Sequence, residues 1–193
     1  MTQAVLTGKK KIEIKELRRQ SLLPGQLRVR VDVALTCGTD IKTYLRGGHP
    51  KFTLPMAFGH EYCGTVIESA SEPVINKLTG KRIEIGDQIM TLPTAPCLKC
   101  PHCLKGLENL CTTGMSTLTM GTYGSEIVIP ERIAHTYSFH KPNNLPAHLA
   151  ALLEPLACVF HSFQSMPQKT DGHTAIIGSG PIALLHLIVA AAE

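Results

Sequence analysis

The first ninety residues alternate apolar and polar positions in short runs that favour strands over helices. Apolar side chains occupy every second position from residue 27 to 33, with arginine and aspartate between them, which is the period of a half-buried strand. Short apolar runs follow at residues 62–67 and 83–90, separated by glycine, proline, serine and asparagine. A later strand at residues 125–129 is ended by Pro130. Closely spaced short strands of this kind predict a barrel-like β fold.

Residues 146–164 change to alanine and leucine at helical spacing. Pro146 suits the first turn of a helix, and Pro155 predicts a kink within it. We expect this helix to end a first domain at residues 1–165. Residues 166–193 then begin a second unit of a different type.

The second unit has the pattern of an apolar strand from residue 173, a glycine turn and an apolar helix. In a nucleotide-binding turn Gly178 would permit the tight bend and Gly180 would let the backbone approach a pyrophosphate. Pro181 and Ile182 begin the helix, whose first N–H groups would face the phosphates. A plain strand-to-helix turn has the same pattern, and the acidic residue that would bind a ribose is expected past the end of the sequence.

Composition and charge limit the class of protein and the partners that the chain can have. The chain has 193 residues, 44% hydrophobic and 18% charged, which is typical of a globular protein. Its formal charge of +4 is scattered apart from three lysines at residues 9–11, which fit a solvated hairpin tip better than a nucleic-acid surface. The apolar run at residues 182–192 is shorter than the roughly 20 residues that span a membrane. With no export signal at the N-terminus, we expect a cytoplasmic protein that binds neither nucleic acid nor membrane.

Four cysteines follow the pattern C-x2-C-x2-C-x7-C, at Cys97, Cys100, Cys103 and Cys111. Two-residue spacers let successive thiolates turn toward one tetrahedral zinc ion. A disulfide cluster would suit a small secreted domain, and ferredoxin-type iron–sulfur motifs continue with C-x3-C-P after the first three cysteines. The spacing therefore favours a closed structural zinc site that folds a lobe.

A second set of metal-binding side chains is dispersed along the chain: Cys37, His60, Glu61 and Glu154. Each has an ordinary alternative as a core thiol, a hydrogen-bonded imidazole or an exposed carboxylate. Together they supply the mixed donor set of catalytic zinc sites, which keep one position open for water or substrate.

The order C-G-T-D, G-H-E, the cysteine lobe, E-P-L-A and G-S-G-P-I-A resembles the zinc-containing medium-chain dehydrogenase/reductase family, the alcohol dehydrogenase superfamily. Glu154 stands where horse-liver-type enzymes carry cysteine, so the chain is similar to the sorbitol, threonine and polyol dehydrogenase branch. The resemblance implies a mainly β GroES-like catalytic domain with a zinc lobe at about residues 95–113. It also implies that residues 166–193 are the start of an α/β Rossmann domain for NAD or NADP.

The resemblance also implies the chemistry. A hydride would pass between NAD(P) and a secondary alcohol or ketone of polyol, sugar or amino-alcohol type, with one catalytic and one structural zinc. Cys37 and His60 would be permanent ligands of the catalytic zinc, and Glu61 and Glu154 would be exchangeable carboxylates beside it. The cysteines of the lobe would hold the structural zinc.

Thr39 matches the hydroxyl that passes the alcohol proton outward in this family. Many relatives follow with histidine where this chain has Lys42, and His49 could replace it only if the intervening loop folds back. Asp40 is expected to brace the ligand loop as a hydrogen-bond acceptor.

Several other side chains are assigned no chemistry. Cys63 and Cys158 are expected to be buried thiols. His102 is expected to be exposed, and the histidines after it have no partner motif.

Two functional readings remain open. Relatives continue into a complete Rossmann sheet, so this chain is either the N-terminal part of a homo-oligomeric dehydrogenase, inactive alone, or a catalytically silent stand-alone zinc module.

Overall fold

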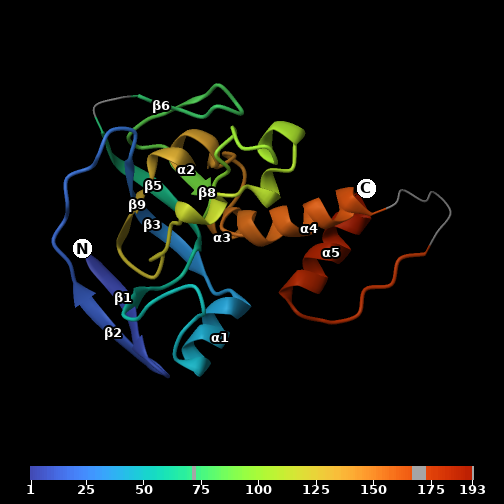
Figure 1. The fold of residues 1–193 in the computed structure, drawn as a ribbon, viewed down its shortest axis with the longest axis horizontal. Helices are drawn as coiled ribbons and strands as arrows, with labels where there is room; N and C mark the ends of the chain where they lie inside the picture. The colour runs from blue at the N-terminus through green and yellow to red at the C-terminus, as the bar shows by residue number, and fades with distance from the viewer. Residues whose placement is uncertain (71–72, 167–172, 193) are drawn as a thin grey trace.

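The computed structural model describes residues 1–70, 73–166 and 173–192, and within them the body of the fold is built from antiparallel sheets (Figure 1). The five-stranded sheet has the order β10-β8-β5-β3-β9 and comprises β3 (Leu27–Leu35), β5 (Glu61–Ser69), β8 (Gln88–Thr91), β9 (Glu126–Ile129) and β10 (Ser138–His140). The three-stranded sheet has the order β2-β1-β4 and comprises β1 (Thr2–Gly8), β2 (Lys11–Glu16) and β4 (Met56–Ala57). A small ribbon pairs β6 (Val74–Ile75) with β7 (Arg82–Ile83).

Five α-helices and three short 3₁₀ turns complete the described residues. The helices are α1 (Gly38–Arg46), α2 (Glu131–Thr136), α3 (Ala147–Ala150), α4 (Leu153–Ser165) and α5 (Pro181–Ala192). The 3₁₀ turns are η1 (Cys103–Lys105), η2 (Glu108–Leu110) and η3 (Gly114–Ser116), all near or within the cysteine lobe. In Figure 1 α4 and α5 lie together on one side of the β body. No helix in the described parts of the chain is both long and apolar enough to cross a bilayer.

The mainly β architecture confirms the expected strands at residues 27–33, 62–67 and 125–129. The predicted strand at residues 83–90 is wrong as a single element. Asp87 accepts a hydrogen bond from the Glu84 N–H at 2.8 Å, and this turn separates β7 from β8.

β3 lies between β5, the middle strand of the five-stranded sheet, and the edge strand β9. Leu27 and Val29 are completely buried, as the alternating pattern predicts. Arg28 breaks that pattern, because it is only 2% exposed and pairs with Glu68 through Nε at 2.7 Å. The register of β3 and β5 places Leu35 opposite Glu61. This pairing brings the residues just after β3 beside the start of β5.

The sequence reading did not anticipate helix α1. Cys37 is its N-cap, and its side chain accepts the Thr39 N–H while the Asp40 carboxylate accepts the Cys37 N–H. These reciprocal bonds form a capping box. Gly47 ends the helix in the left-handed region, at φ 79°.

The predicted helix over residues 146–164 is divided in two. α3 ends at Ala150 and α4 begins at Leu153, whereas the expected kink at Pro155 is wrong. Pro155 lies in the first turn of α4, where its missing N–H breaks no helical hydrogen bond.

Of the predicted strand and helix after residue 172, only the helix forms. α5 packs on α4 through Val159, Leu185 and Val189, but the predicted strand from residue 173 is wrong. Ile177 in that segment is 99% exposed, and no strand among the described residues pairs with it. A single strand without a neighbour leaves its backbone groups unpaired, which explains why none forms. The domain boundary predicted near residue 165 stays a prediction, because residues 167–172 lie outside the described part.

Candidate functional site

The four lobe cysteines converge on one point. The sulfur atoms of Cys97, Cys100, Cys103 and Cys111 all lie within 4.8 Å of one another. The Cys100 and Cys103 sulfurs are 3.5 Å apart, and all four thiols are free. A tetrahedral zinc with bonds of about 2.3 Å has S···S edges of about 3.8 Å, so the cluster fits this ion.

The backbone of the lobe supports thiolates. The Cys97 N–H donates to the Cys111 sulfur at 3.2 Å, and the Cys100 N–H donates to the Cys97 sulfur at 3.3 Å. Backbone N–H groups of Cys103 and Thr112 lower the pKa of Cys100 to about 5, whereas burial and the neighbouring Cys100 raise the pKa of Cys103. These donors favour the deprotonated form that a metal requires. The lobe also contains His102, which is half-buried rather than exposed as expected.

The lobe is fixed to the body of the protein by side chains of α2 and its C-terminal end. The Tyr137 hydroxyl donates to the Glu108 carboxylate at 2.6 Å. Arg132 donates to the Thr113 carbonyl at 3.0 Å. These contacts hold the lobe beside β8 and α4.

A second group of metal-binding atoms forms where β3 and β5 meet. Ligand atoms of Cys37, His60 and Glu61 lie within 4.8 Å of one another. Cys37 caps α1, His60 precedes β5 and Glu61 begins it, so the starts of these two elements bring the three side chains to one point. Thiolate, imidazole and carboxylate form a mixed donor set that suits zinc and leaves room for a further ligand.

Asp40 braces this cluster as expected. Its carboxylate accepts the Cys37 N–H at 3.0 Å and the Tyr123 hydroxyl at 3.0 Å, and it lies 3.5 Å from His60 Nδ1. Tyr123 also contacts the Leu35 carbonyl, at 2.9 Å. The chain of contacts ties the end of β3, the start of α1 and His60 to one carboxylate.

The cluster attracts positive charge. Burial opposes protonation of His60, but the Asp40 carboxylate and the Cys37 thiolate raise its pKa to about 9. Burial raises the pKa of Glu61, although His60 opposes this effect. Within the protein the negative groups therefore favour a cation at this point, either a proton or a metal ion.

A pocket of about 310 Å³ opens beside the cluster. Thr39, His49, His60 and Glu154 all line it. Glu154 reaches this pocket from α4 but does not belong to the tight group around Cys37. The loop after α1 folds back, which places His49 in the same pocket as Thr39, whereas Lys42 is not among the lining residues.

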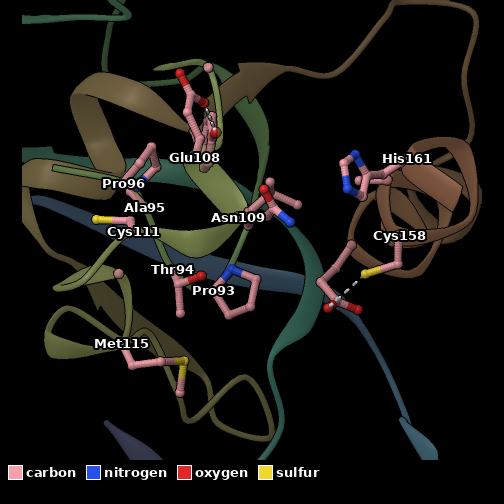
Figure 2. Close-up of a pocket in the computed structure, with 16 residues that line it drawn as sticks. Pro93, Thr94, Ala95, Pro96, Glu108, Asn109, Cys111, Met115, Cys158 and His161 are labelled. Atoms are coloured by element: carbon pink, nitrogen blue, oxygen red, sulfur yellow. Dashed lines mark hydrogen bonds between the residues drawn. The ribbon is translucent and has the colours of Figure 1, made fainter. Parts of the chain in front are cut away.

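A larger pocket of about 470 Å³ adjoins the first and shares Pro93, Thr94, Met115 and Glu154 with it. Figure 2 shows Cys158 and His161 of α4 on one side of this pocket and Asn109 of the lobe on the other. The Cys158 sulfur lies 3.8 Å from the Glu154 carboxylate, and Cys158 is exposed. The expected burial of Cys158 is thus wrong, because its face of α4 lines the pocket, while Cys63 is completely buried as expected.

The glycine turn before α5 has the predicted conformational freedom. Gly178 has φ 133°, and a side chain at Gly180 would meet no atom within 4 Å. Pro181 begins α5 and Ile182 follows it. Because the preceding strand is absent, the turn does not stand at a sheet edge among the described residues.

A mainly β domain with a four-cysteine lobe and a separate thiolate–imidazole–carboxylate cluster defines the class of zinc-type dehydrogenase catalytic domains. The chain belongs to the alcohol dehydrogenase GroES-like domain family, whose sequence profile matches residues 23–139.

Proteins of similar sequence confirm the polyol branch of the family. D-altritol 5-dehydrogenase of Agrobacterium fabrum is 36% identical over 175 residues, which cover 88% of this chain and 48% of that protein. Sorbitol dehydrogenase of Bombyx mori is 31% identical over 186 residues, covering 94% of this chain and 51% of that protein. The chain therefore spans about half the length of these curated relatives.

Solved structures confirm the fold over nearly the whole chain. A zinc-binding dehydrogenase from Sinorhizobium meliloti, bound to NADP, has a TM-score of 0.78 and 28% identity, covering 99% of this chain and 53% of that one. An alcohol dehydrogenase from Thermotoga maritima has a TM-score of 0.83 and 26% identity, covering 99% of this chain and 55% of that one.

Proposed function

We propose that this chain forms the catalytic-domain part of a zinc-dependent dehydrogenase that exchanges a hydride between NAD(P) and a secondary alcohol of polyol, sugar or amino-alcohol type. The observation that carries the proposal is the convergence of Cys37, His60 and Glu61 beside a pocket that Thr39 lines. The similarity to altritol and sorbitol dehydrogenases supports the substrate class.

The proposed metal sites follow from the donor sets. Cys37, His60 and Glu61 would hold the catalytic zinc, with Glu154 as an exchangeable carboxylate at the pocket wall. The four cysteines of the lobe would hold the structural zinc. When bound, the catalytic zinc supplies Lewis acidity that lowers the pKa of an alcohol hydroxyl.

The chain's own residues would orient the donors and move the proton. Asp40 fixes Cys37 through the backbone and faces His60, so it holds two donors in place. The Thr39 hydroxyl makes no hydrogen bond to the described residues, and Thr39 lines the pocket with His49. His49 Nδ1 accepts the Lys51 N–H at 3.2 Å, so the proton of the neutral imidazole lies on Nε2, and His49 would take a further proton at Nδ1 with loss of this bond. The route from the substrate would run through Thr39 toward His49.

The cofactor site would use the turn before α5. Gly178 and Gly180 would let the backbone approach the pyrophosphate, and Pro181 and Ile182 would begin the helix that faces it. The Sinorhizobium meliloti neighbour is bound to NADP, which supports a nicotinamide dinucleotide. A complete polypeptide of this kind would be a homo-oligomer.

The test is the effect of Thr39→Ala on alcohol oxidation by the protein in its native length. We expect turnover to fall by about 10²-fold or more, the range for loss of a positioned proton-transfer group, with zinc content unchanged. Thr39→Ser should restore most of the turnover. Equal loss of zinc and turnover in Thr39→Ala would show that the residue is structural.

A second function, a catalytically silent zinc module, is favoured by the described residues 173–180, which form no strand before α5. Titration of the native-length protein with NADH and NADPH separates the two, because the module would bind neither.

A further inference from the structure

A basic pocket lies at the opposite end of β3 from the metal-binding cluster. Its volume is about 750 Å³, and three arginines are among its lining residues: Arg18, Arg19 and Arg28. The segment at residues 17–21, which leads from β2 toward β3, forms most of its wall, and Val128 of β9 contributes the rest with Met1. Arg28 and Cys37 are nine residues apart along an extended strand, which separates this pocket from the cluster by about 25–30 Å.

Arg28 is built into the floor of this pocket. It is 2% exposed, its Nε donates to Glu68 at 2.7 Å and its Nη2 donates to the Gln20 carbonyl. A guanidinium group has five N–H donors in a planar fork. The Nη1 end makes no hydrogen bond to the described residues, and it is not among the polar atoms that are cut off from solvent. The unused donors of a buried cation therefore face the pocket.

The charges around the pocket leave a positive excess. Arg19 pairs with Glu126, and Arg28 pairs with Glu68. Arg18 has no ion pair with any side chain in the described parts of the chain. Two carboxylates thus offset two of the three arginines, and the third positive charge remains. Exposed Gln20 and Ser21 add neutral hydrogen-bonding groups to the rim.

We propose that this pocket binds a phosphate group, either free or as part of a small phosphorylated molecule. A tetrahedral oxyanion can accept from two guanidinium forks at once, and such charge-assisted bonds are shorter and stronger than neutral ones. Arg28 is the preorganised donor, because Glu68 and the Gln20 carbonyl already fix its plane. Arg18, which is exposed at the pocket wall, is the second donor. The site is independent of the metal centres and of the proposed hydride transfer.

The test is titration calorimetry of the zinc-loaded chain with inorganic phosphate and, separately, with glycerol 3-phosphate, at low ionic strength. We expect one saturable site, with the tighter of the two ligands identifying the source of the phosphate group. Arg18→Gln should weaken binding by about 10-fold, because one charge-assisted contact is lost. Arg28→Lys keeps the charge but lacks the fork, and it should weaken binding to a similar extent.

Two controls locate the site. Arg82→Gln makes the same change in net charge at an arginine that is 63% exposed and pairs with Glu84, and it should bind phosphate like the wild type. His60→Ala should also leave binding unchanged, which separates this pocket from phosphate bound at a metal. If Arg28→Lys fails to fold, the effect of Arg18→Gln on phosphate binding decides the test, because Arg18 is exposed and its substitution should leave the fold intact.

The proposal is overturned if neither ligand gives saturable binding, if Arg18→Gln and Arg82→Gln weaken binding equally, or if His60→Ala abolishes it.

Discussion

Tyr123→Phe tests whether the network behind the metal-binding cluster controls metal affinity. The Tyr123 hydroxyl lies 3.0 Å from the Asp40 carboxylate and 2.9 Å from the Leu35 carbonyl. The substitution removes this hydroxyl and leaves the ring in its edge-on contact with Phe58, at a centroid distance of 5.3 Å. The Cys37 N–H remains as a hydrogen-bond donor to the carboxylate. Asp40 therefore loses one restraint on its position relative to His60.

The expected magnitude follows from what is lost. A hydrogen bond to a charged group contributes about 1.5–3 kcal/mol to stability, so we expect the free energy of unfolding to fall by about 1.5 kcal/mol or more. Loss of an outer hydrogen bond of a metal ligand commonly weakens metal binding 10–100-fold, and Tyr123 acts through Asp40. We therefore expect zinc affinity at the Cys37 cluster to fall by about 10-fold.

Tyr62→Phe is the matched control. Tyr62 is 1% exposed and follows Glu61 directly, and its hydroxyl accepts a hydrogen bond of 3.1 Å from the Thr91 hydroxyl in the core. The same chemical change should cost about 1 kcal/mol of stability and leave zinc affinity unaltered. Competition with a chromophoric chelator measures zinc affinity, and urea unfolding measures stability. Equal weakening of zinc binding in both variants, or none in Tyr123→Phe, would refute the reasoning.

Two further predictions concern the scaffold. Gly59→Ala should destabilise the fold by about 2–4 kcal/mol, because Gly59 has φ 86° and a Cβ there would lie 2.5 Å from Thr122 Oγ1. Gly80 has φ 68° with no atom within 4 Å of a Cβ, so Gly80→Ala should cost only about 1–2 kcal/mol in the same urea assay. Equal costs of the two substitutions would exclude the steric explanation. Burial opposes ionisation of Asp32, but hydrogen bonds from Thr65, Arg30 and Gln88 lower its pKa overall. Ionised Asp32 therefore stabilises the fold at a pH above its pKa in the unfolded chain, about 3.9, and this stabilisation is lost as the pH falls below that value. Asp32→Asn should therefore flatten the acid side of a stability-versus-pH curve, and an unchanged acid slope would contradict this assignment.

Motif spacing was enough to predict the cysteine lobe, because its donors are close in sequence and no long-range geometry is needed. The cluster around Cys37 was named from the residues but depended on the fold. Only the β3–β5 register, with Leu35 opposite Glu61, shows that its members meet. The hydrogen bonds around this cluster could not be predicted from sequence, since no motif connects Tyr123 with Asp40, 83 residues away.

Errors in the fold prediction have local physical causes. The sequence does not predict helix α1, because cysteine is not among the residues that usually cap a helix, although Cys37 and Asp40 form a capping box in the structure. The strand before α5 was predicted from apolar residues alone, but strand formation requires a neighbouring strand. The alternation of apolar and polar residues in β3 predicts that Arg28 faces solvent. Its ion pair with Glu68 allows it to be buried instead.

The most direct test of the account is the zinc content of protein purified without chelators, measured by elemental analysis against protein concentration. Two separate donor clusters predict two zinc ions per chain, falling to one in Cys103→Ser and to one in His60→Ala. A wild-type value of one zinc, unchanged in His60→Ala, would leave the lobe as the only metal site and contradict the proposed catalytic centre. A value of zero would contradict both sites.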